Sequence, residues 1–360
     1  MHRRDFVATA MGTLAAGSVP WDTMSVAAPQ TRRLVIDGLG EIHLDYDMAL
    51  IDAIRASGMR GCVVTVGNPA LHGPDAFDDM RREIEGYDRH VAAHPDRLSR
   101  ADSVADLDRA AARGTIGLIY YPQNATPIQD DLERLRTLYD LGVRIVQLTY
   151  NTRNLLGDGC LERTNAGLSR FGVQVVERMN QMGMLVDLSH CGEATTADGI
   201  ALSGKPVAIT HAGCKAVFDH PRNKTDQALR ALADKGGVIG IYQINPYLGP
   251  KDRNTLDDYL NHIDHAVNVA GIDHVGVGSD REHRTIPDTE EEKQKLIAEL
   301  SELRPVTAAT FRWPFFIAEL NHPRRMETIA DGLARRGRSG AEIDKILGGN
   351  WYRLLRETIG

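Results

Sequence analysis

The chain has 360 residues, of which 42% are apolar, so it can bury the core of one large domain or of two smaller ones. Its formal net charge is −7 and it contains no basic run, which excludes nucleic acid as an expected partner. After the first thirty residues, no apolar run is long enough to span a membrane.

The amino-terminal segment is typical of an export signal. A pair of arginines, Arg3-Arg4, precedes a weakly apolar run at residues 7–19 and the small-residue sequence Ser-Val-Ala-Ala at residues 25–28. This order predicts a twin-arginine signal peptide over residues 1–28, and the alternatives are a disordered amino terminus or a short membrane anchor. The mature chain, residues 29–360, is then expected in a bacterial periplasm or outside the cell. Twin-arginine export moves folded proteins, often with their metal already bound.

The mature chain alternates short apolar runs with helix-like segments. The apolar runs are continuous, as expected for parallel strands that are buried on both faces. Eight of them are predicted strands: Leu34–Gly38, Gly61–Val66, Thr115–Tyr121, Val143–Thr149, Met184–Leu188, Pro206–Thr210, Gly237–Tyr242 and His274–Gly278. The predicted helices between them are Tyr46–Ser57, Ser103–Arg113, Asp130–Leu141, Glu193–Ser203, Asp226–Lys235 and Leu256–Ala270, and several more close the chain from Glu290 to Gly360.

This alternation predicts the α/β class and a single domain over residues 29–360. Eight strand–helix units favour a (β/α)8 barrel of the TIM type with extra carboxyl-terminal helices. A doubly wound open sheet is the alternative. In such barrels the chemistry lies at the carboxyl ends of the strands, so these ends are where functional residues are sought.

Two consecutive strands end in a histidine. His190 follows the run Met184–Leu188, and His211 follows the run Pro206–Thr210. Parallel strands bring such ends to one rim, and two neutral imidazoles there suit a divalent metal such as zinc. The alternative is that each histidine merely terminates its strand.

Other polar residues are expected on the same rim. Asp280 follows the eighth strand, where a third metal ligand or a general base is needed, although a helix cap is the other interpretation. Arg222, in the loop after His211, is a candidate to hold a substrate carboxylate through a bidentate fork, or else a surface arginine paired with Asp226. The loop from Asn151 to Leu168 is either a lid over the mouth or a plain connection.

Several motifs, in this order along nearly all of the mature chain, resemble those of the membrane (renal) dipeptidase family. They are Asp187-Leu188-Ser189-His190, Thr210-His211, His220-Pro221-Arg222-Asn223, Gly276-Val277-Gly278-Ser279-Asp280 and Gly348-Gly349-Asn350-Trp351. The resemblance implies a zinc-dependent (β/α)8 barrel of the amidohydrolase type that cleaves dipeptides with two metals. It also implies that His190 and His211 bind the second metal, that Asp280 ligates the first metal and handles the proton, and that Arg222 binds the substrate carboxylate.

Three positions depart from the family pattern. The family has a His-x-Asp pair after the first strand, where this chain has Leu39 and Glu41, and His43-Leu44-Asp45 lies four residues further on. The family's bridging glutamate appears as Gln123, and its active-site histidine after the fourth strand appears as Tyr150. A bridging carboxylate offsets the repulsion of two cations, and glutamine cannot do this. We therefore expect one ion, with Gln123 and Glu41 as further candidate ligands.

These residues predict a metal-dependent hydrolase of dipeptides or dipeptide-like small amides. Asp280 would serve as general base, and Tyr150 would donate a hydrogen bond to the developing oxyanion. Tyr150 and Asn151, which end the fourth strand, would also contact the substrate. Two alternatives remain: a tailoring enzyme for a secreted metabolite on the same scaffold, and a barrel that has lost catalysis. The resemblance also makes a homodimer plausible, because members of the family often form dimers.

Overall fold

The computed structural model describes residues 33–303 and 311–360, which belong to one compact unit, Arg33–Gly360. The predicted signal peptide lies outside the described residues. The strands are β1 Val35–Asp37, β2 Met59–Thr65, β3 Leu98–Arg100, β4 Ile116–Tyr121, β5 Ile145–Gln147, β6 Leu185–Asp187, β7 Ala208–Ala212, β8 Val238–Ile241 and β9 Val275–Val277.

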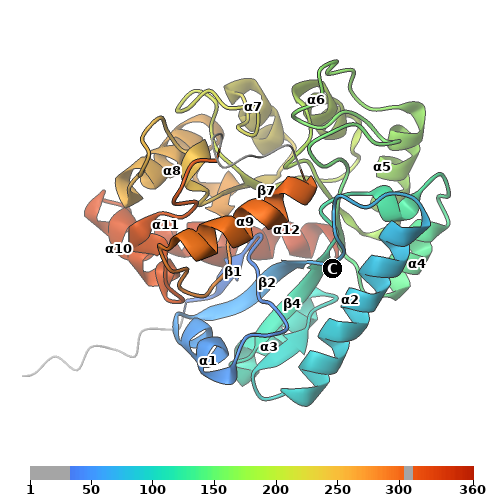
Figure 1. Cartoon of the computed structure of the whole chain (residues 1–360). Coiled ribbons are helices and arrows are strands. Elements are labelled where there is room, and N and C mark those ends of the chain that lie inside the picture. Colours follow the sequence, from blue (N-terminus) through green and yellow to red (C-terminus); the bar gives the residue numbers. More distant parts are fainter. Residues whose placement is uncertain (1–32, 304–310) are drawn as a thin grey trace, which may run out of the picture. The chain divides into compact units, whose positions relative to one another are not determined.

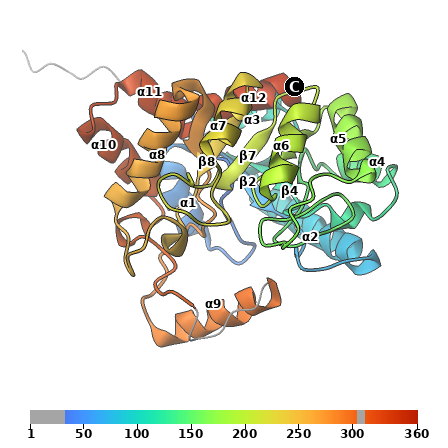
Figure 2. The same ribbon diagram turned by 90° about the horizontal axis from the view of Figure 1, so that it is seen from above.

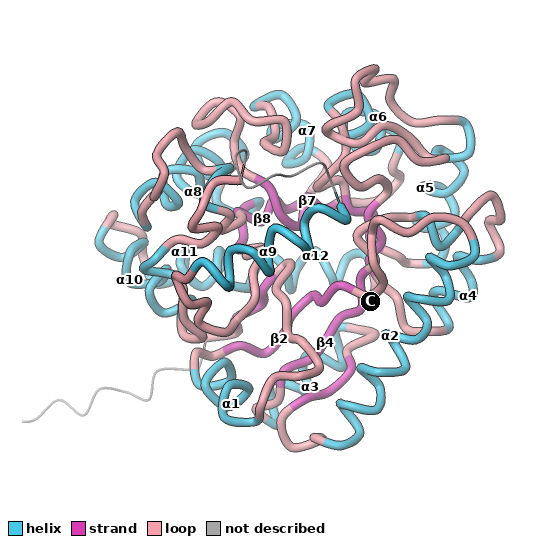
Figure 3. The backbone as a smooth tube through the Cα atoms, viewed as in Figure 1, coloured by secondary structure: helices cyan, strands magenta, loops and turns pink. Residues whose placement is uncertain are grey.

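Helices cover the outside of these strands (Figure 3). The α-helices are α1 Met48–Ala56, α2 Pro74–Ala93, α3 Val104–Arg113, α4 Arg134–Asp140, α5 Arg170–Met182, α6 Glu193–Leu202, α7 Asp226–Asp234, α8 Leu256–Ala270, α9 Glu290–Leu303, α10 Arg325–Arg335, α11 Gly340–Asp344 and α12 Asn350–Thr358. The single-turn elements are η1 Thr126–Ile128, η2 Asn245–Tyr247, η3 Ile272–His274, η4 Ala318–Leu320 and η5 Lys345–Gly349. Within the described part of the chain, no helix combines the length and apolar character needed to cross a bilayer.

The strands form two parallel runs, β1-β2-β4-β3 and β5-β6-β7-β8-β9, that close on each other. At one seam the Gly38 N–H donates to the Val277 carbonyl over 2.9 Å. At the other, the Gln147 N–H donates to the Pro122 carbonyl over 3.2 Å. The eight predicted strands therefore form a closed (β/α)8 barrel, and the predicted fold class is confirmed.

Three elements of the structure were not predicted: α2, β3 and α5. The short β3 pairs with the first residues of β4, so it supplements the barrel without changing its order. The 20-residue helix α2 is rich in charge, but it buries Ala76, Met80, Ile84 and Tyr87. Their spacing of four, four and three residues is the signal of one helical face that would have identified it.

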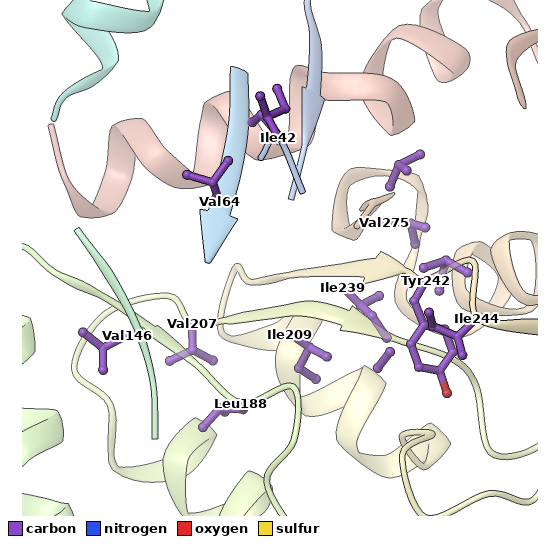
Figure 4. Close-up of a cluster of buried hydrophobic side chains, with 14 of the residues drawn as sticks. Ile42, Val64, Val146, Leu188, Val207, Ile209, Ile239, Tyr242, Ile244 and Val275 are labelled. Carbon is purple, nitrogen blue, oxygen red and sulfur yellow. The ribbon is translucent and has the colours of Figure 1, made fainter. Parts of the chain in front are cut away.

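Alternate strand residues divide the core into two layers. Val64, Val146, Ile209 and Ile239 belong to one buried cluster (Figure 4). Neighbouring positions on the strands supply a second cluster, which also contains Trp351 of α12. Successive strand residues face opposite sides of a sheet, so one layer packs under the helices while the other fills the barrel.

Trp351 fits against the inner surface of the barrel where side chains are absent. Its indole N–H donates to the Val277 carbonyl over 2.8 Å. A Cβ added to Gly276 would lie 2.5 Å from the indole nitrogen, and one added to Gly38 would lie 2.3 Å from the ring. The two views show α12 at one end of the barrel and α9 at the other (Figures 1 and 2). The carboxyl-end loops and the candidate site share the α9 end.

We predict that Gly276→Ala destabilises the protein by about 1–3 kcal/mol, because the added methyl overpacks the space that Trp351 fills. Urea unfolding monitored by tryptophan fluorescence measures this loss. The matched control is Gly340→Ala at the start of α11, where an added Cβ meets nothing within 4 Å. Equal stabilities for the two variants would contradict the tight packing of Trp351 against Gly276.

Candidate active site

The ends of β6 and β7 bring the two predicted histidines together. The chain leaves β6 at Asp187 and reaches His190 three residues later, whereas His211 lies within β7. Asp187 pairs with Ala208 in parallel register, so both imidazoles lie at the same rim. Their ring centroids are 5.0 Å apart with an interplanar angle of 62°. His190 is 5% exposed and His211 is fully buried.

Hydrogen bonds orient both rings. The Nδ1 of His190 lies 2.9 Å from Asn151 Oδ1, and an amide oxygen accepts, so the proton lies on Nδ1 and the lone pair on Nε2. The Nδ1 of His211 lies 2.9 Å from Thr210 Oγ1. Its Nε2 is buried and has no hydrogen-bond partner among the described residues. Burial, reinforced by nearby cations, lowers the pKa of His211 well below its usual range, so this imidazole is neutral at pH 7.

A buried carboxylate aligns the two strand ends. Asp187 accepts hydrogen bonds from the Tyr121 hydroxyl at 2.5 Å, the Ser189 hydroxyl at 2.8 Å and the Thr210 N–H at 2.6 Å. The Ser189 hydroxyl oxygen in turn accepts the His211 N–H at 3.0 Å. Burial raises the pKa of Asp187, and these donors oppose the rise. The network holds the backbone on both sides of His211.

The loop after β7 supplies two buried cations, the first of which is Arg222. Its guanidinium donates to the Ser189 carbonyl and, over 3.1 Å, to the His211 carbonyl. It therefore spans the residues next to one histidine and the backbone of the other. The guanidinium also lies 5.7 Å from the Tyr242 ring centroid. The alternative pairing of Arg222 with Asp226 is absent, since Asp226 receives the His265 Nε2 at 2.7 Å and its arginine partner is Arg230.

The second buried cation is Lys224, which is only 4% exposed. Its ammonium donates to the carbonyls of Leu188 and Cys191, both at 2.8 Å, and to the Thr196 hydroxyl at 3.0 Å. Burial lowers its pKa to about 8. The two carbonyls bracket His190, so Lys224 fixes the turn that carries this histidine.

Asp280 lies just past β9 with a left-handed backbone, φ +53°. Such a conformation is unfavourable for a residue other than glycine, and here the Asp280 N–H is held by the Leu39 carbonyl at 2.8 Å. Burial raises the pKa of Asp280 to about 7, and the Glu41 carboxylate adds to the rise while Arg222 opposes it. A carboxyl group with this pKa can accept and return a proton near neutrality.

Several of the predicted site residues line one cavity of about 270 Å³. The predicted site residues that line it are Glu41, Gln123, Tyr150, Asn151, His190, Arg222 and Asp280. Tyr150 stacks on His190 with ring centroids 4.2 Å apart. His211 is outside the lining and lies next to His190.

Of the positions that depart from the family pattern, Glu41, Gln123 and Tyr150 line this cavity and Leu39 does not. Gln123 Nε2 donates to Thr65 Oγ1 at 2.8 Å, and the Thr65 hydroxyl donates to Glu41 at 2.5 Å. Leu39 is fully buried in the core. His43 lines the cavity, whereas the neighbouring Asp45 faces outward.

The candidate metal donors of this site are the two imidazoles of His190 and His211. Within residues 33–303 and 311–360, no three or more His, Cys, Asp or Glu side chains form a group that could hold an ion. The ring centroids of the two imidazoles are 5.0 Å apart, and the buried Nε2 of His211 has no hydrogen-bond partner among the described residues. Asp280 lines the same cavity as His190.

Sequence reasoning missed several residues of the cavity wall. They are Leu161, Ile244, Tyr247, Arg281, Glu282, Leu296, Glu299, Leu300 and Phe315, whereas His43 and His220, which also line the cavity, were named in the sequence without a role. Most come from loops and from α9, where no strand end marks their position. Glu282 could have been found from the sequence, since it follows Asp280 by only two residues. In the structure it forms a parallel bridge with Glu41.

Comparisons with known proteins agree with this geometry. A crystallised amidohydrolase from Pseudomonas aeruginosa has a TM-score of 0.81 and is 30% identical, covering 91% of this chain and 97% of that one. A Rhodobacter sphaeroides metallopeptidase, crystallised with a phosphinate mimic of the dipeptide L-Ala-D-Ala, shares the fold with a TM-score of 0.68, 19% identity, and coverage of 91% and 99%. The fold and the cavity thus define a barrel hydrolase.

Residues 19–304 match the sequence model of the membrane dipeptidases, peptidase family M19. This chain therefore belongs to the membrane dipeptidase family, whose members are metallohydrolases. An uncharacterised Klebsiella pneumoniae protein encoded 5′ of pqqA is 28% identical over 79% of this chain and 97% of its own length. The dipeptidase verJ of Clonostachys rogersoniana is 35% identical over 57% of this chain, but the match spans only 54% of verJ.

We predict that Lys224→Met destabilises the protein, because it removes the charged donor at 2.8 Å from the buried Leu188 and Cys191 carbonyls. The two carbonyls keep only their longer bonds, at 3.2 Å, from the Cys191 N–H and the Thr196 hydroxyl. A hydrogen bond from a charged donor contributes about 1.5–3 kcal/mol. Chemical unfolding measures the loss. Lys235→Met is the matched control, since the Lys235 ammonium donates to carbonyls near the surface and should cost little. A Lys224 variant as stable as the control would show that the hydrogen bonds of Lys224 contribute nothing to the free energy of unfolding.

His262 of α8 fixes the chain just beyond His211. Its Nδ1 accepts the Cys214 N–H at 2.9 Å, and its Nε2 lies 3.0 Å from the Leu248 carbonyl, to which it donates. A second ring proton would point at the Cys214 N–H. Burial lowers the pKa of His262 to about 4, and the position of the Cys214 N–H also disfavours a second ring proton.

The lowered pKa makes stability depend on pH in a defined window. Between pH 6.5 and about 4 the unfolded chain binds a proton at His262 and the folded protein does not, so stability falls as the pH falls. The full contribution is about 3 kcal/mol. His262→Gln keeps one donor and one acceptor without titrating. We expect the free energies of unfolding of wild type and variant to converge from pH 6.5 to pH 4; parallel curves would refute the assignment.

Proposed function

We propose that this chain hydrolyses dipeptides or dipeptide-like small amides with the help of a single divalent cation, most suitably zinc, held by His190 and His211. The observation that carries the proposal is the buried, unpartnered Nε2 of His211 beside a second oriented imidazole, next to a cavity lined by Asp280 and Arg222. The cavity, about 270 Å³, suits a substrate of dipeptide size.

Each residue then has a chemical role. A cation held by the imidazoles would polarise the amide carbonyl and acidify water. Asp280 takes the proton of the attacking water and returns it to the leaving amine, because its pKa lies near neutrality. Tyr150 stacks on His190 and donates to the developing oxyanion.

Arg222 and Asn151 hold the substrate and the site. A guanidinium has five N–H donors, so Arg222 can bind two backbone carbonyls and still donate to a substrate carboxylate. Asn151 fixes the tautomer of His190 and borders the same cavity. One ion suffices in this scheme, because Leu39 and Gln123 are neutral where the resemblance implies the ligands of another metal.

The proposal also includes the compartment in which the protein acts. The Arg3-Arg4 segment and the small residues at 25–28 support export through the twin-arginine route, which carries proteins that are already folded. The metal would then be bound before export, and the enzyme would act on small peptides in the periplasm or outside the cell.

We predict that His211→Ala lowers zinc affinity by at least about 100-fold. Loss of a residue that only hydrogen-bonds to a metal ligand already lowers affinity by about 10–100-fold, and His211 would be a ligand itself. Dipeptide hydrolysis should fall with it, because a single remaining imidazole cannot retain the ion. Metal content after dialysis and kcat/KM for L,L and L,D dipeptides measure the two effects. His72→Ala, an exposed histidine outside this cavity, is the control.

The stoichiometry tests the number of ions. We expect about one zinc per folded chain by elemental analysis. A wild-type protein that binds no metal and cleaves no dipeptide under any metal supplement would refute the proposal, and two ions per chain would refute the single-ion site.

A further inference from the structure

The helix α9 stands apart from the other helices. It lies across the open end of the barrel, opposite α12, and its body is separated from the remaining ribbons when the barrel is turned by 90° (Figures 1 and 2). Three of its residues line the cavity: Leu296, Glu299 and Leu300. Their spacing of three and four residues places them on one helical face. This face, which we call the α9 wall, meets the space where a substrate would lie.

The beginning of α9 is fixed by polar contacts. Arg284 bonds Glu292 in the first turns of α9 and also Glu282 in the cavity wall. Just before the helix, Asp288 receives the Trp313 indole N–H at 2.6 Å and an Arg253 N–H at 2.8 Å. These contacts hold the α9 wall in a defined place.

The chemistry of the α9 wall is mainly apolar. Leu296 and Leu300 are partly buried and pack against the hydrophobic core, so they keep surface available to the cavity. Ile244 and Phe315 supply further apolar lining from the barrel side. Glu299 carries the one charge of the wall, and its side chain is 54% exposed. A substrate group that meets this surface gains by burying apolar area.

None of these residues takes part in the proposed chemistry. The histidines, Asp280 and Arg222 act on the amide and the carboxylate, which every dipeptide has. The side chains are what differ between dipeptides, and an apolar wall discriminates between side chains by the area that it removes from water.

We propose that Leu296 and Leu300 of α9, together with Phe315, form a specificity wall that selects substrates with a large apolar side chain. This inference rests on the proposed function and names its substrate class. The preferred substrates are dipeptides with a leucine- or phenylalanine-like residue.

The test compares two series of dipeptides, X-Ala and Ala-X, in which X is Gly, Ala, Leu, Phe or Lys. In one of the series we expect kcat/KM for Leu and Phe to exceed that for Gly by about 10–200-fold. Leu296→Ala and Leu300→Ala should remove most of this preference by raising KM, while the Gly substrates change little. Ile297→Ala is the matched control, since Ile297 lies on the same helix and packs on the core but is outside the cavity lining.

Two results would overturn the specificity wall. The first is equal kcat/KM across both series, which would leave the proposed function intact. The second is a preference for Lys that Glu299→Gln abolishes, because charge would then select the substrate.

Binding separates the inference from the failure of catalysis. Phosphinate mimics of the same dipeptides, titrated calorimetrically into the zinc-supplemented full chain, report side-chain preference without turnover. Tighter binding of Leu and Phe mimics that is lost in Leu296→Ala supports the wall even if no dipeptide is cleaved. Binding that is absent, or independent of X, overturns it.

Discussion

The site depends on one buried carboxylate. Asp187 is fully buried at the end of β6, and such a charge is tolerated only when donors surround it. Its donors come from three different strands: Tyr121 from β4, Ser189 beyond β6, and the Thr210 backbone in β7. Because satisfying Asp187 requires all of these ends to meet, the same requirement sets the register of the two histidine-bearing strands.

Two buried cations complete this arrangement from the other side. Arg222 donates to the Ser189 and His211 carbonyls, and Lys224 donates to the Leu188 and Cys191 carbonyls, so the two cations bind the backbone around both histidines. Their charges also help to keep the pKa of His211 low. Both cations donate to backbone carbonyls, so they fix the chain on either side of the rings while they disfavour protonation of His211.

The sequence predicts what is local and periodic. His190 and His211 were found because each follows an apolar run, and strand ends in a parallel barrel converge by topology. His43, Tyr247 and Phe315 carry no such mark, since their place in the cavity depends on how irregular loops fold. The three residues of the α9 wall show the same limit: their helical spacing was readable, but nothing in the spacing says that α9 crosses the barrel mouth. The helix α2 was missed for a different reason, because its many charges hide a regular buried face.

The altered half of the cavity is as well built as the half with the histidines. Leu39 is buried in the core, and Gln123 joins Thr65 and Glu41 in a hydrogen-bonded chain. The Gln123 carbonyl also accepts from the Gln147 amide, which ties the chain to β5. A cation that bound there would have to displace these hydrogen bonds. The residues at these altered positions therefore stabilise the cavity wall through their own packing and hydrogen bonds.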